Sequence, residues 1–349
     1  MSVVSIKSLA NHLWAQTCYA LSHIGIECVA PMPTFLSIEP ASFCQLSCPQ
    51  CPVGMAHSAE GTKRVLIGSI SVVEARVNKQ SVLPMDLFRK ILADCEGYVH
   101  TIQFYFQGEP LLHPQLAEMI RLAHEAHIYT TTSTNAQALT PLLAEQLIQS
   151  GLDRIIVSID GLSEESYSTY RQGGSLQKAL RGLVYLRDAK DRLGGHTHIE
   201  LQCLRLKSNE HEWAMFERSY HQMGADSLTL KTAQFYDYQQ GNPLMPTDER
   251  FCRYARQEDG TYRPKNRLQP ARKTIFHRPC YRLHTGCVIT TAGEVLPCCF
   301  DKSAQHSWGN IRSQSLREIW QGQKAQQFRH KVRLNRASFS ICTNCTEKE

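Results

Sequence analysis

The sequence predicts an α/β fold in which six parallel strands form an open, partial (βα)6 barrel of the TIM type, followed by a small cysteine-rich unit. Between residues 34 and 233, short apolar stretches typical of strands alternate with helical patterns. Parallel neighbours need long right-handed crossovers, and strands that are apolar on both faces are buried on both faces. Six such units fall short of the eight that close a barrel, so we expect an open one.

The barrel elements alternate in chain order. Strands are expected at residues 34–40, 100–106, 128–133, 153–159, 197–206 and 227–233. Helices are expected at residues 84–97, 114–127, 140–151, 163–171, 175–193 and 209–224. In the first helix Met85, Phe88, Leu92 and Cys95 recur at helical spacing. The polar motifs of the chain follow the carboxyl ends of the strands, where such sheets gather their chemistry.

Three segments, one before the barrel, one within it and one after it, are less regular. Residues 1–33 predict a helical extension packed on the main domain, because one early charge, Lys7, and an interrupted apolar stretch do not make a secretory signal. Residues 57–83 fit no clear unit and could form a loop over the site or a hairpin. Residues 236–279 are rich in Pro, Gly and charge, which predicts a linker.

The end of the chain predicts a β-hairpin and a helix. Residues 287–300 alternate around Gly293 as a hairpin does. Residues 315–333 predict one helix whose inward side chains are Leu316, Ile319, Trp320 and Phe328. The expected domains are therefore an extension (1–33), a barrel core (34–235), a linker (236–279) and a cysteine-rich domain (280–349).

Composition is that of an ordinary globular protein, with 42% hydrophobic and 20% charged residues. No apolar run approaches ~18 residues, so no membrane span is expected. The net charge of +6 does not by itself indicate a nucleic-acid binder. Basic residues gather at 263–282 and 328–336, and each stretch could be a solvated surface or a surface for an anionic partner or substrate.

Fourteen cysteines are many for a chain without an export signal. In a cytoplasmic protein, the location we expect, clustered cysteines more often bind metal than form disulfides. Five are scattered and are expected to be buried thiols that act as small hydrophobes: Cys18, Cys28, Cys95, Cys203 and Cys252.

Three cysteines, Cys44, Cys48 and Cys51, form a C-x3-C-x2-C array directly after the first strand. Four thiolates close a zinc site or complete a [4Fe–4S] cluster. Three thiolates on a cubane cluster leave one iron without a protein ligand, where a small molecule can bind. A zinc site with a distant fourth ligand is the alternative.

This array and three further motifs resemble those of the radical S-adenosylmethionine superfamily. The companions are "QGEP" (107–110), "STN" (133–135) and "SIDG" (158–161), the last with Arg171 downstream. The resemblance covers roughly residues 34–233 and implies a [4Fe–4S] cluster on the three cysteines, with S-adenosylmethionine as its remaining ligand. The cofactor-binding residues that it implies are Gly108, Glu109, Pro110, Ser133, Asn135, Ser158, Asp160 and Arg171.

The chemistry of these side chains agrees with that ligand. Glu109 can receive the methionyl ammonium, and Arg171 is a planar fork of donors for the carboxylate. Gly108 lets the ligand approach the backbone closely. The chain departs from the usual family pattern at Gln50, where an aromatic residue is common, and at Gln107 and Ala136, where glycine is common.

The C-terminal cysteines resemble the SPASM extension of the same superfamily, or its shorter Twitch form. Cys280, Gly293 and Cys298 fit C-x12-G-x4-C, and Cys342 and Cys345 follow as C-x2-C. The resemblance implies one auxiliary [4Fe–4S] cluster on Cys280, Cys298, Cys342 and Cys345. Cys287 or Cys299 could ligate instead, and a structural zinc site remains an alternative.

The expected function is that of a radical S-adenosylmethionine oxidoreductase or maturase-like enzyme. It would reductively cleave S-adenosylmethionine to a 5′-deoxyadenosyl radical, which abstracts hydrogen from a substrate; no catalytic side chain is assigned. A flavodoxin or ferredoxin would supply electrons. The substrate would be a peptide, a protein or a small, sugar-like molecule, and only about 33 residues precede the barrel, too few for the peptide-recognition domain of many relatives. The rival is a zinc-binding adaptor that contacts nucleic acid without catalysis.

Overall fold

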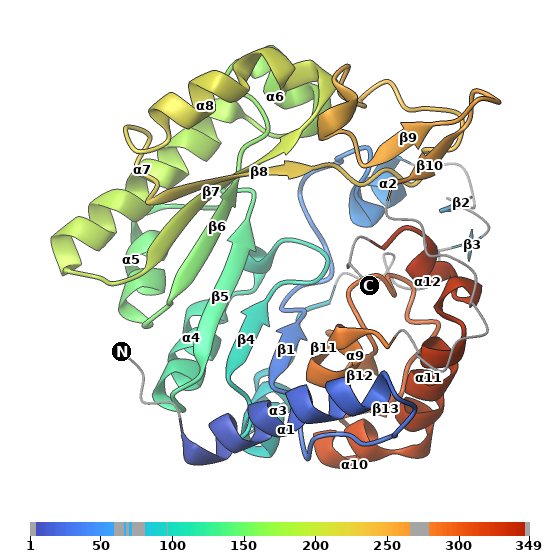
Figure 1. Ribbon diagram of the computed structural model, residues 1–349. Helices are drawn as coiled ribbons and strands as arrows, with labels where there is room; N and C mark the ends of the chain where they lie inside the picture. Colours follow the sequence, from blue (N-terminus) through green and yellow to red (C-terminus); the bar gives the residue numbers. More distant parts are fainter. Residues whose placement is uncertain are drawn as a thin grey trace.

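The computed structural model describes residues 5–58, 66–67, 70–71, 81–95, 97–265 and 279–345. Within them the main sheet has nine strands in the order β13-β12-β11-β1-β4-β5-β6-β7-β8 (Figure 1). Six are parallel and form the curved sheet of the barrel: β1 (Phe35–Ile38), β4 (Thr101–Phe104), β5 (Tyr129–Thr134), β6 (Arg154–Ser158), β7 (His198–Arg205) and β8 (Ser227–Thr232). The expected partial (βα)6 barrel is confirmed.

Helices cover the outer face of these strands (Figure 1). They are α3 (Met85–Cys95), α4 (Leu116–Glu125), α5 (Pro141–Gln149), α6 (Glu164–Tyr170), α7 (Leu176–Leu193) and α8 (Trp213–Ser219). The longest, α7, begins where the Ser175 side chain accepts from the Lys178 N–H and ends at Gly194 in the left-handed region (φ 62°). Alternate strand residues such as Ile155, Val157 and Leu201 are fully buried against this layer.

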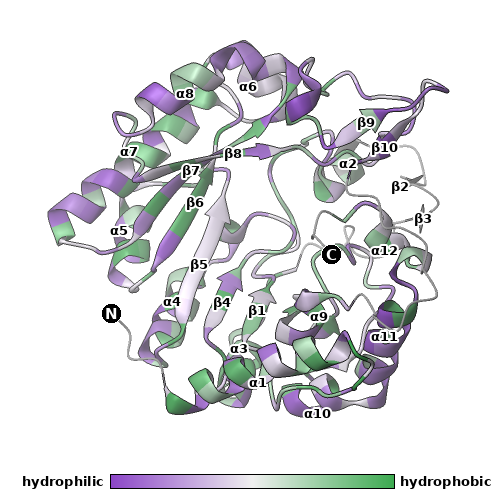
Figure 2. Cartoon of the chain, viewed as in Figure 1, coloured by the Kyte–Doolittle hydropathy of each residue, from purple (hydrophilic) through white to green (hydrophobic). Residues whose placement is uncertain are grey.

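The other face of the strands is polar and turns toward the interior of the barrel. Because side chains alternate along a strand, Arg154 lies on the same face of β6 as Ser158. The parallel register aligns Ser158 with Gln202 and Gln202 with Thr229, so Lys231 joins that face. Figure 2 shows the resulting green and purple bands along β6 and β7.

Two expected helices are shorter than the sequence suggested. The stretch 209–224 begins as a 3₁₀ helix, η2 (Lys207–Glu212), because Asn209 accepts from the Leu206 N–H and donates to the Asp160 carbonyl. Helix α8 follows it and ends at Ser219. The single helix expected at 315–333 is two, α10 (Leu316–Gln321) and α11 (Gln323–Leu334), separated by Gly322 in an extended conformation (ψ 160°).

The expected hairpin near the C-terminus is present and joins the barrel sheet. Strand β11 (Gly286–Ile289) pairs antiparallel with β12 (Glu294–Leu296), which pairs with β13 (Gly309–Asn310). Strand β11 also pairs in parallel with β1, Leu36 facing Cys287. The cysteine-rich region therefore continues the sheet past β1.

The segment expected to be a linker is partly regular. Strands β9 (Tyr254–Arg256) and β10 (Tyr262–Pro264) pair antiparallel. The buried Tyr254 hydroxyl donates to the Phe235 carbonyl and bonds to the Asn344 side chain, so this segment ties the barrel to the end of the chain. Residues 266–278 of the expected linker lie outside the described residues.

The stretch 57–83 contains a short antiparallel ladder between β2 (Leu66–Ile67) and β3 (Ile70–Ser71), which favours the hairpin alternative. Most of the remaining residues of this stretch lie outside the described residues. Helix α2 (Pro52–Ser58) follows the cysteine array directly and ends at the start of this stretch.

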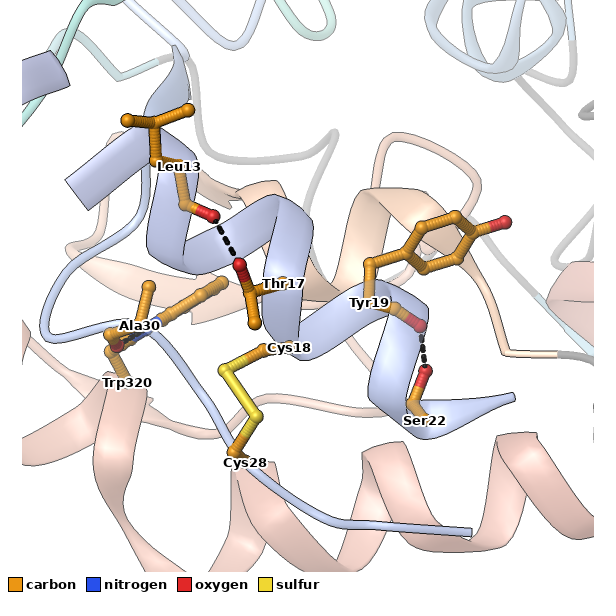
Figure 3. The surroundings of a disulfide bond; sticks show 8 residues. All are labelled: Leu13, Thr17, Cys18, Tyr19, Ser22, Cys28, Ala30 and Trp320. Atoms are coloured by element: carbon orange, nitrogen blue, oxygen red, sulfur yellow. Dashed lines mark hydrogen bonds between the residues drawn. A yellow bond between two sulfur atoms is a disulfide. The ribbon is translucent and has the colours of Figure 1, made fainter. Parts of the chain in front are cut away.

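The N-terminal extension is helix α1 (Ile6–Ser22), which packs against α9 (Tyr281–Thr285) as well as the barrel. Two cysteines that we expected to be independent buried thiols, Cys18 and Cys28, form a disulfide that ties the end of α1 to the chain beyond it (Figure 3). Disulfides are uncommon in a reducing cytosol, so the expected cytoplasmic location did not predict this pair, and that location stays a prediction.

The basic stretch 328–336 is not simply a solvated surface. Arg329 and Arg336 are buried, and the side chain of Arg333 is only 9% exposed. The expectation of a solvated surface is therefore wrong for these three residues. No helix among the described residues has the length and apolar content needed to cross a membrane.

Candidate active site

A pocket of about 220 Å³ lies at the carboxyl ends of the barrel strands and contains the three cysteines of the first array. It brings together residues of four sequence motifs and several that the sequence did not single out. Its lining comprises Cys44, Leu46, Cys48, Cys51, Tyr105, Phe106, Gly108, Glu109, Ser133, Thr134, Asn135, Ser158, Tyr170, Arg171 and Leu204. Of the expected cofactor-binding residues, Pro110 and Asp160 are not part of the lining.

Two glycines hold the cysteine loop by close backbone contact. Gly108 has φ 70°, and a Cβ there would lie 2.3 Å from the Ala41 carbonyl oxygen. The next residue, Glu109, donates its N–H to the Phe43 carbonyl at 2.8 Å. A Cβ on Gly54, in α2, would lie 2.4 Å from the backbone N and O of Cys48. Only residues without a side chain allow this packing.

The sulfur of Cys44 accepts two hydrogen bonds, one from within the cysteine loop and one from the end of β5. The Leu46 N–H and the Asn135 side-chain amide each donate to Cys44 Sγ at 3.4 Å. Hydrogen bonds to the sulfurs help to set the potential of iron–sulfur clusters. Asn135, expected to be a cofactor contact, thus also touches the cysteine array.

The buried thiols of Cys44 and Cys48 stay protonated at neutral pH unless a bound cation stabilises their thiolate forms. Burial, opposed by the Leu46 N–H and assisted by Glu109 and the neighbouring thiols, raises the pKa of Cys44 to about 12. Burial likewise raises the pKa of Cys48 to about 11, against the charge of Arg171. A bound metal cluster would supply the positive charge that stabilises all three thiolates. The donor set of this pocket fits such a cluster.

Glu109 lies at the base of the pocket and is 2% exposed. Its Oε1 accepts from the Thr134 hydroxyl (2.7 Å) and the Leu111 N–H (3.1 Å), and its Oε2 accepts from the Asn135 N–H (2.9 Å). Burial raises its pKa, while these donors oppose the rise. A carboxylate has about four acceptor positions, so one remains for a ligand donor.

Arg171 enters the pocket from the end of α6 and is held by Asp160. Its Nε lies 2.6 Å from Asp160 Oδ2, and Asp160 Oδ1 accepts from the Leu204 N–H at 2.6 Å. Burial opposes the charge on Arg171, but Asp160 next to it holds the pKa above its usual value. The structure therefore places Asp160 behind Arg171 rather than on the pocket wall.

The departures from the family pattern have local consequences. Gln50 accepts from the Tyr236 N–H at 3.0 Å and so ties the cysteine loop to the segment after β8. Gln107 donates to the Lys302 carbonyl at 2.9 Å. Ala136 has φ 61°, a region that favours glycine, which explains why a glycine would be common there.

Sequence reasoning missed the aromatic wall of the pocket. Tyr105 and Phe106 stand immediately before the "QGEP" motif, and Tyr170 immediately precedes Arg171. Their nearness to motif residues in sequence was the available signal. Tyr105 lies next in sequence to the buried end of β4, and alternation turns its side chain to the inner face.

The four expected auxiliary ligands come together near the C-terminus. Burial raises the pKa of Cys298 well above its usual range, and the thiols of Cys299, Cys280 and Cys342 add to the rise. Burial also raises the pKa of Cys342 to about 12, with Cys280 and Cys345 adding to the rise and Arg336 opposing it.

The two alternative ligands differ in position. Cys287 is buried in β11, close to Arg329 and Cys95, and it is not among the thiols that raise the pKa of Cys298 or Cys342. Cys299 adjoins Cys298, and its sulfur accepts from Arg282 Nη1 at 3.7 Å. The ligand set itself stays a prediction.

Family models match the two regions that carry these sites. The model of the radical SAM superfamily matches residues 38–199. The chain belongs to the radical SAM superfamily. The model of the SPASM iron–sulfur cluster-binding domain matches residues 280–346. This radical SAM enzyme therefore has a [4Fe–4S] cluster with S-adenosylmethionine in its first domain, and auxiliary iron–sulfur binding in its second.

Curated and solved relatives agree with this assignment. The radical SAM chain is 25% identical to an AdoMet-dependent heme synthase from Methanosarcina barkeri, over 83% of this chain and 82% of the relative. It is 24% identical to a tungsten-containing aldehyde ferredoxin oxidoreductase cofactor-modifying protein from Pyrococcus furiosus, over 90% and 88%. The structure of Streptococcus suis SuiB bound to the precursor peptide SuiA superposes with a TM-score of 0.62 at 14% identity, over 98% of this chain and 76% of SuiB, which shows the shared fold.

Proposed function

We propose that this radical SAM enzyme oxidises a small anionic molecule held inside the barrel. A bound cluster would supply one electron for the cleavage of S-adenosylmethionine to methionine and a 5′-deoxyadenosyl radical, which would abstract a hydrogen atom from the substrate. The substrate radical would then lose a proton and a second electron, and the auxiliary cluster would accept that electron. The observation that carries the proposal is the single pocket that unites Cys44, Cys48 and Cys51 with Glu109 and Arg171.

Each of these groups has a proposed task. The thiolates of Cys44, Cys48 and Cys51 would hold the cluster in the pocket that Glu109 and Arg171 also line. The remaining acceptor position of Glu109 receives the ammonium of the methionyl group, and Arg171 receives its carboxylate. The ion pair with Asp160 fixes the position of the Arg171 guanidinium group. The aromatic wall of half-buried Tyr105 and Phe106 and buried Tyr170 helps to exclude water from the reacting atoms.

The inner face of the barrel favours an anionic substrate. Lys231, whose pKa is lowered chiefly by burial, also lies in the field of Arg154, Arg253 and Arg282, with Glu200 as the opposing carboxylate. Glu200 is already paired with Arg154. Among the groups that act on Lys231, cations therefore outnumber carboxylates. A substrate that carries carboxylates would compensate this excess of positive charge.

Unpartnered polar atoms on the same side of the molecule support a polar substrate. Among the described residues, Thr131 Oγ1, Gln202 Oε1, and Nε and Nη1 of Arg253 are buried without a hydrogen-bond partner. Buried polar groups are normally satisfied, so these atoms are candidates for substrate contacts.

The curated relatives support a small molecule over a peptide. Two are named for making heme or for modifying a cofactor, and neither name mentions a peptide. SuiB with its peptide shares the fold, but at 14% identity this likeness supports no choice of substrate. We propose a flavodoxin or ferredoxin as the electron donor and the cytoplasm as the location.

The first experiment is cleavage of S-adenosylmethionine by anaerobically reconstituted, dithionite-reduced protein. We expect 5′-deoxyadenosine and methionine, and their loss in Arg171→Gln, while Arg192→Gln on the surface of α7 retains the activity. Absence of 5′-deoxyadenosine from the wild-type protein, with every candidate substrate present, would overturn the proposal.

The substrate class has its own test. Small di- and tricarboxylates, heme among them, are compared with their methyl esters as stimulators of 5′-deoxyadenosine formation. We expect the acids to stimulate 5′-deoxyadenosine formation by the wild-type enzyme more than the esters do. In Lys231→Met the difference in stimulation between acid and ester should be smaller. Equal stimulation by acid and ester would reject the anionic substrate while leaving the radical SAM activity intact.

A further inference from the structure

Three metal-ligating side chains meet at the amino-terminal edge of the barrel, away from the active site. They are His124 at the end of α4, Asp153 in the turn between α5 and β6, and His196 in the turn between α7 and β7. One ligand atom from each lies within 4.8 Å of the others. Asp153 precedes β6, whereas Ser158 ends it in the pocket, so the two sites are about 16 Å apart along the strand.

Asp153 is fixed so that one carboxylate oxygen is left for a further partner. Its Oδ2 accepts from the N–H of Thr130 at 2.8 Å and from its hydroxyl at 3.1 Å. These bonds orient the carboxylate as hydrogen bonds orient the ligands of many metal sites. Its other oxygen, Oδ1, lies 3.6 Å from Nε2 of His196.

That separation suits two ligands of one ion better than it suits a hydrogen bond. A contact of 3.6 Å is too long for a hydrogen bond. Two ligands bound to zinc at about 2.0–2.2 Å with tetrahedral angles lie about 3.4 Å apart. The Asp153–His196 pair is therefore close to the spacing that a shared cation requires.

The third ligand is held by backbone packing. The His124 ring rests on Gly151, where φ is 78° and a Cβ would lie 2.5 Å from the ring. The rings of His124 and His196 have centroids 5.9 Å apart and planes inclined by 32°. Within the described residues, neither ring nitrogen of His124 has a hydrogen-bond partner, so one is available to an ion.

We propose that His124, Asp153 and His196 bind one divalent cation of the zinc class. Two imidazoles and one carboxylate suit zinc, nickel or cobalt, whereas magnesium and calcium prefer oxygen ligands. A water molecule completes a four-coordinate site. The ion links α4 to the turns before β6 and β7, so its role is to stabilise the barrel rather than to take part in the radical reaction.

The test uses the reconstituted holoenzyme, freed of loosely bound metal and then treated with zinc chloride. Zinc retained after gel filtration is measured per chain, together with Tm as free zinc increases. We expect wild-type protein to retain about one zinc more than His196→Gln, and its Tm to rise with zinc while that of the variant does not. Magnesium chloride is expected to leave both proteins unchanged.

Matched variants separate this site from zinc bound elsewhere. His196 has a side chain that is 59% exposed, so its replacement is not expected to disturb folding. His211→Gln, at a histidine 70% exposed outside the site, is expected to behave as wild type. Zinc taken up by incomplete cysteine sites is common to all three proteins and cancels in the comparison. Equal zinc retention and an equal rise of Tm in wild type and His196→Gln would overturn the proposal.

Discussion

Glu109 shows how one residue can serve both the fold and the chemistry. Its carboxylate caps the 3₁₀ helix η1 (Pro110–Leu112) and accepts from Thr134 and Asn135, and it also lines the pocket. In Glu109→Gln one carboxylate oxygen becomes an amide N–H₂, which cannot accept from the donor that faces it. The lost hydrogen bond lowers the free energy of unfolding by about 1–3 kcal/mol. Because the charge is also lost, we expect the Kd for S-adenosylmethionine to rise by about tenfold or more.

Equilibrium binding of S-adenosylmethionine and urea unfolding would measure these two effects. The matched control is Glu118→Gln, at a partly exposed carboxylate that pairs with Arg121 on the outer face of α4. It should change neither quantity by more than about 0.5 kcal/mol. An unaltered Kd in Glu109→Gln would show that Glu109 does not contact the ligand.

His284 gives the protein a specific dependence on pH. It is 6% exposed, and burial, with the charge of Arg329, lowers its pKa from 6.5 to about 4. The folded state therefore holds His284 neutral while the unfolded chain binds a proton below pH 6.5. The stability that this site contributes is complete above pH 6.5 and is lost as pH falls toward 4, by about 1.4 kcal/mol per pH unit.

Anaerobic urea unfolding between pH 7.5 and 5.5 would detect this loss. We expect His284→Gln to lose about 1 kcal/mol less than wild type over that interval. His211→Gln should retain the wild-type dependence. Parallel curves for wild type and His284→Gln would assign the pH dependence to other groups.

The sequence predicted which polar residues lie near the site, but it did not predict the contacts that each of them makes. Glu109 could be located because it follows an apolar strand, whereas Arg171, at the end of α6, was singled out only by the resemblance of its surroundings to the superfamily motif. Nothing in "SIDG" shows that Asp160 lies behind Arg171, since that depends on where the Leu204 N–H approaches it. The pairing of Cys18 with Cys28 was equally hidden, because a cysteine at this spacing also serves as a buried thiol.

At the scale of single elements, α2 is the support on which the first metal site rests. The backbone of Cys48 lies against Gly54, where a Cβ would be only 2.4 Å from two backbone atoms. In Gly54→Ala the loop must move away from the helix, so we expect loss of the first cluster, about four irons per chain. Iron analysis and 5′-deoxyadenosine formation would both fall.

The control for this substitution is Gly194→Ala at the end of α7. Gly194 has φ 62° but no atom within 4 Å of the added Cβ, so the change costs about 1 kcal/mol of backbone strain and no clash. Its iron content should equal that of wild type. Full iron content and activity in Gly54→Ala would mean that the loop does not depend on this contact.

Element types were predictable where local periodicity determines them. The six strands and their helices follow from apolar spacing, and tertiary packing agrees with that preference. The break at Gly322 and the 3₁₀ start at Lys207–Glu212 depend on other interactions. At the latter, Asn209 bonds to backbone groups of another segment, and such bonds compete with a regular helix.

The whole molecule is joined in a way that the sequence alone does not reveal. Strand β11 pairs with β1, which lies about 250 residues earlier, so barrel and SPASM hairpin share one sheet. Hydrophobic alternation predicts a hairpin but does not name its neighbour, because pairing partners so distant in sequence leave no local pattern. The expected domain boundaries stay predictions.

This shared sheet holds two separate thiolate sites, which leads to the last prediction. None of the four C-terminal cysteines lines the pocket of Cys44, Cys48 and Cys51. With two cubane clusters, the reconstituted protein should contain about eight irons. Replacing either set by Ala, the three pocket cysteines or Cys342 with Cys345, should remove about half.

The two replacements should differ in activity, because the three pocket cysteines share their pocket with Glu109 and Arg171, whereas none of the four C-terminal cysteines lines it. Changing the three pocket cysteines should abolish 5′-deoxyadenosine formation, whereas changing Cys342 and Cys345 should leave cleavage in the absence of substrate measurable. Cys287→Ala, at a buried cysteine of β11 outside the expected ligand set, should retain all the iron. Full iron in the Cys342 and Cys345 variant, or iron lost from Cys287→Ala, would require a different ligand set for the auxiliary site.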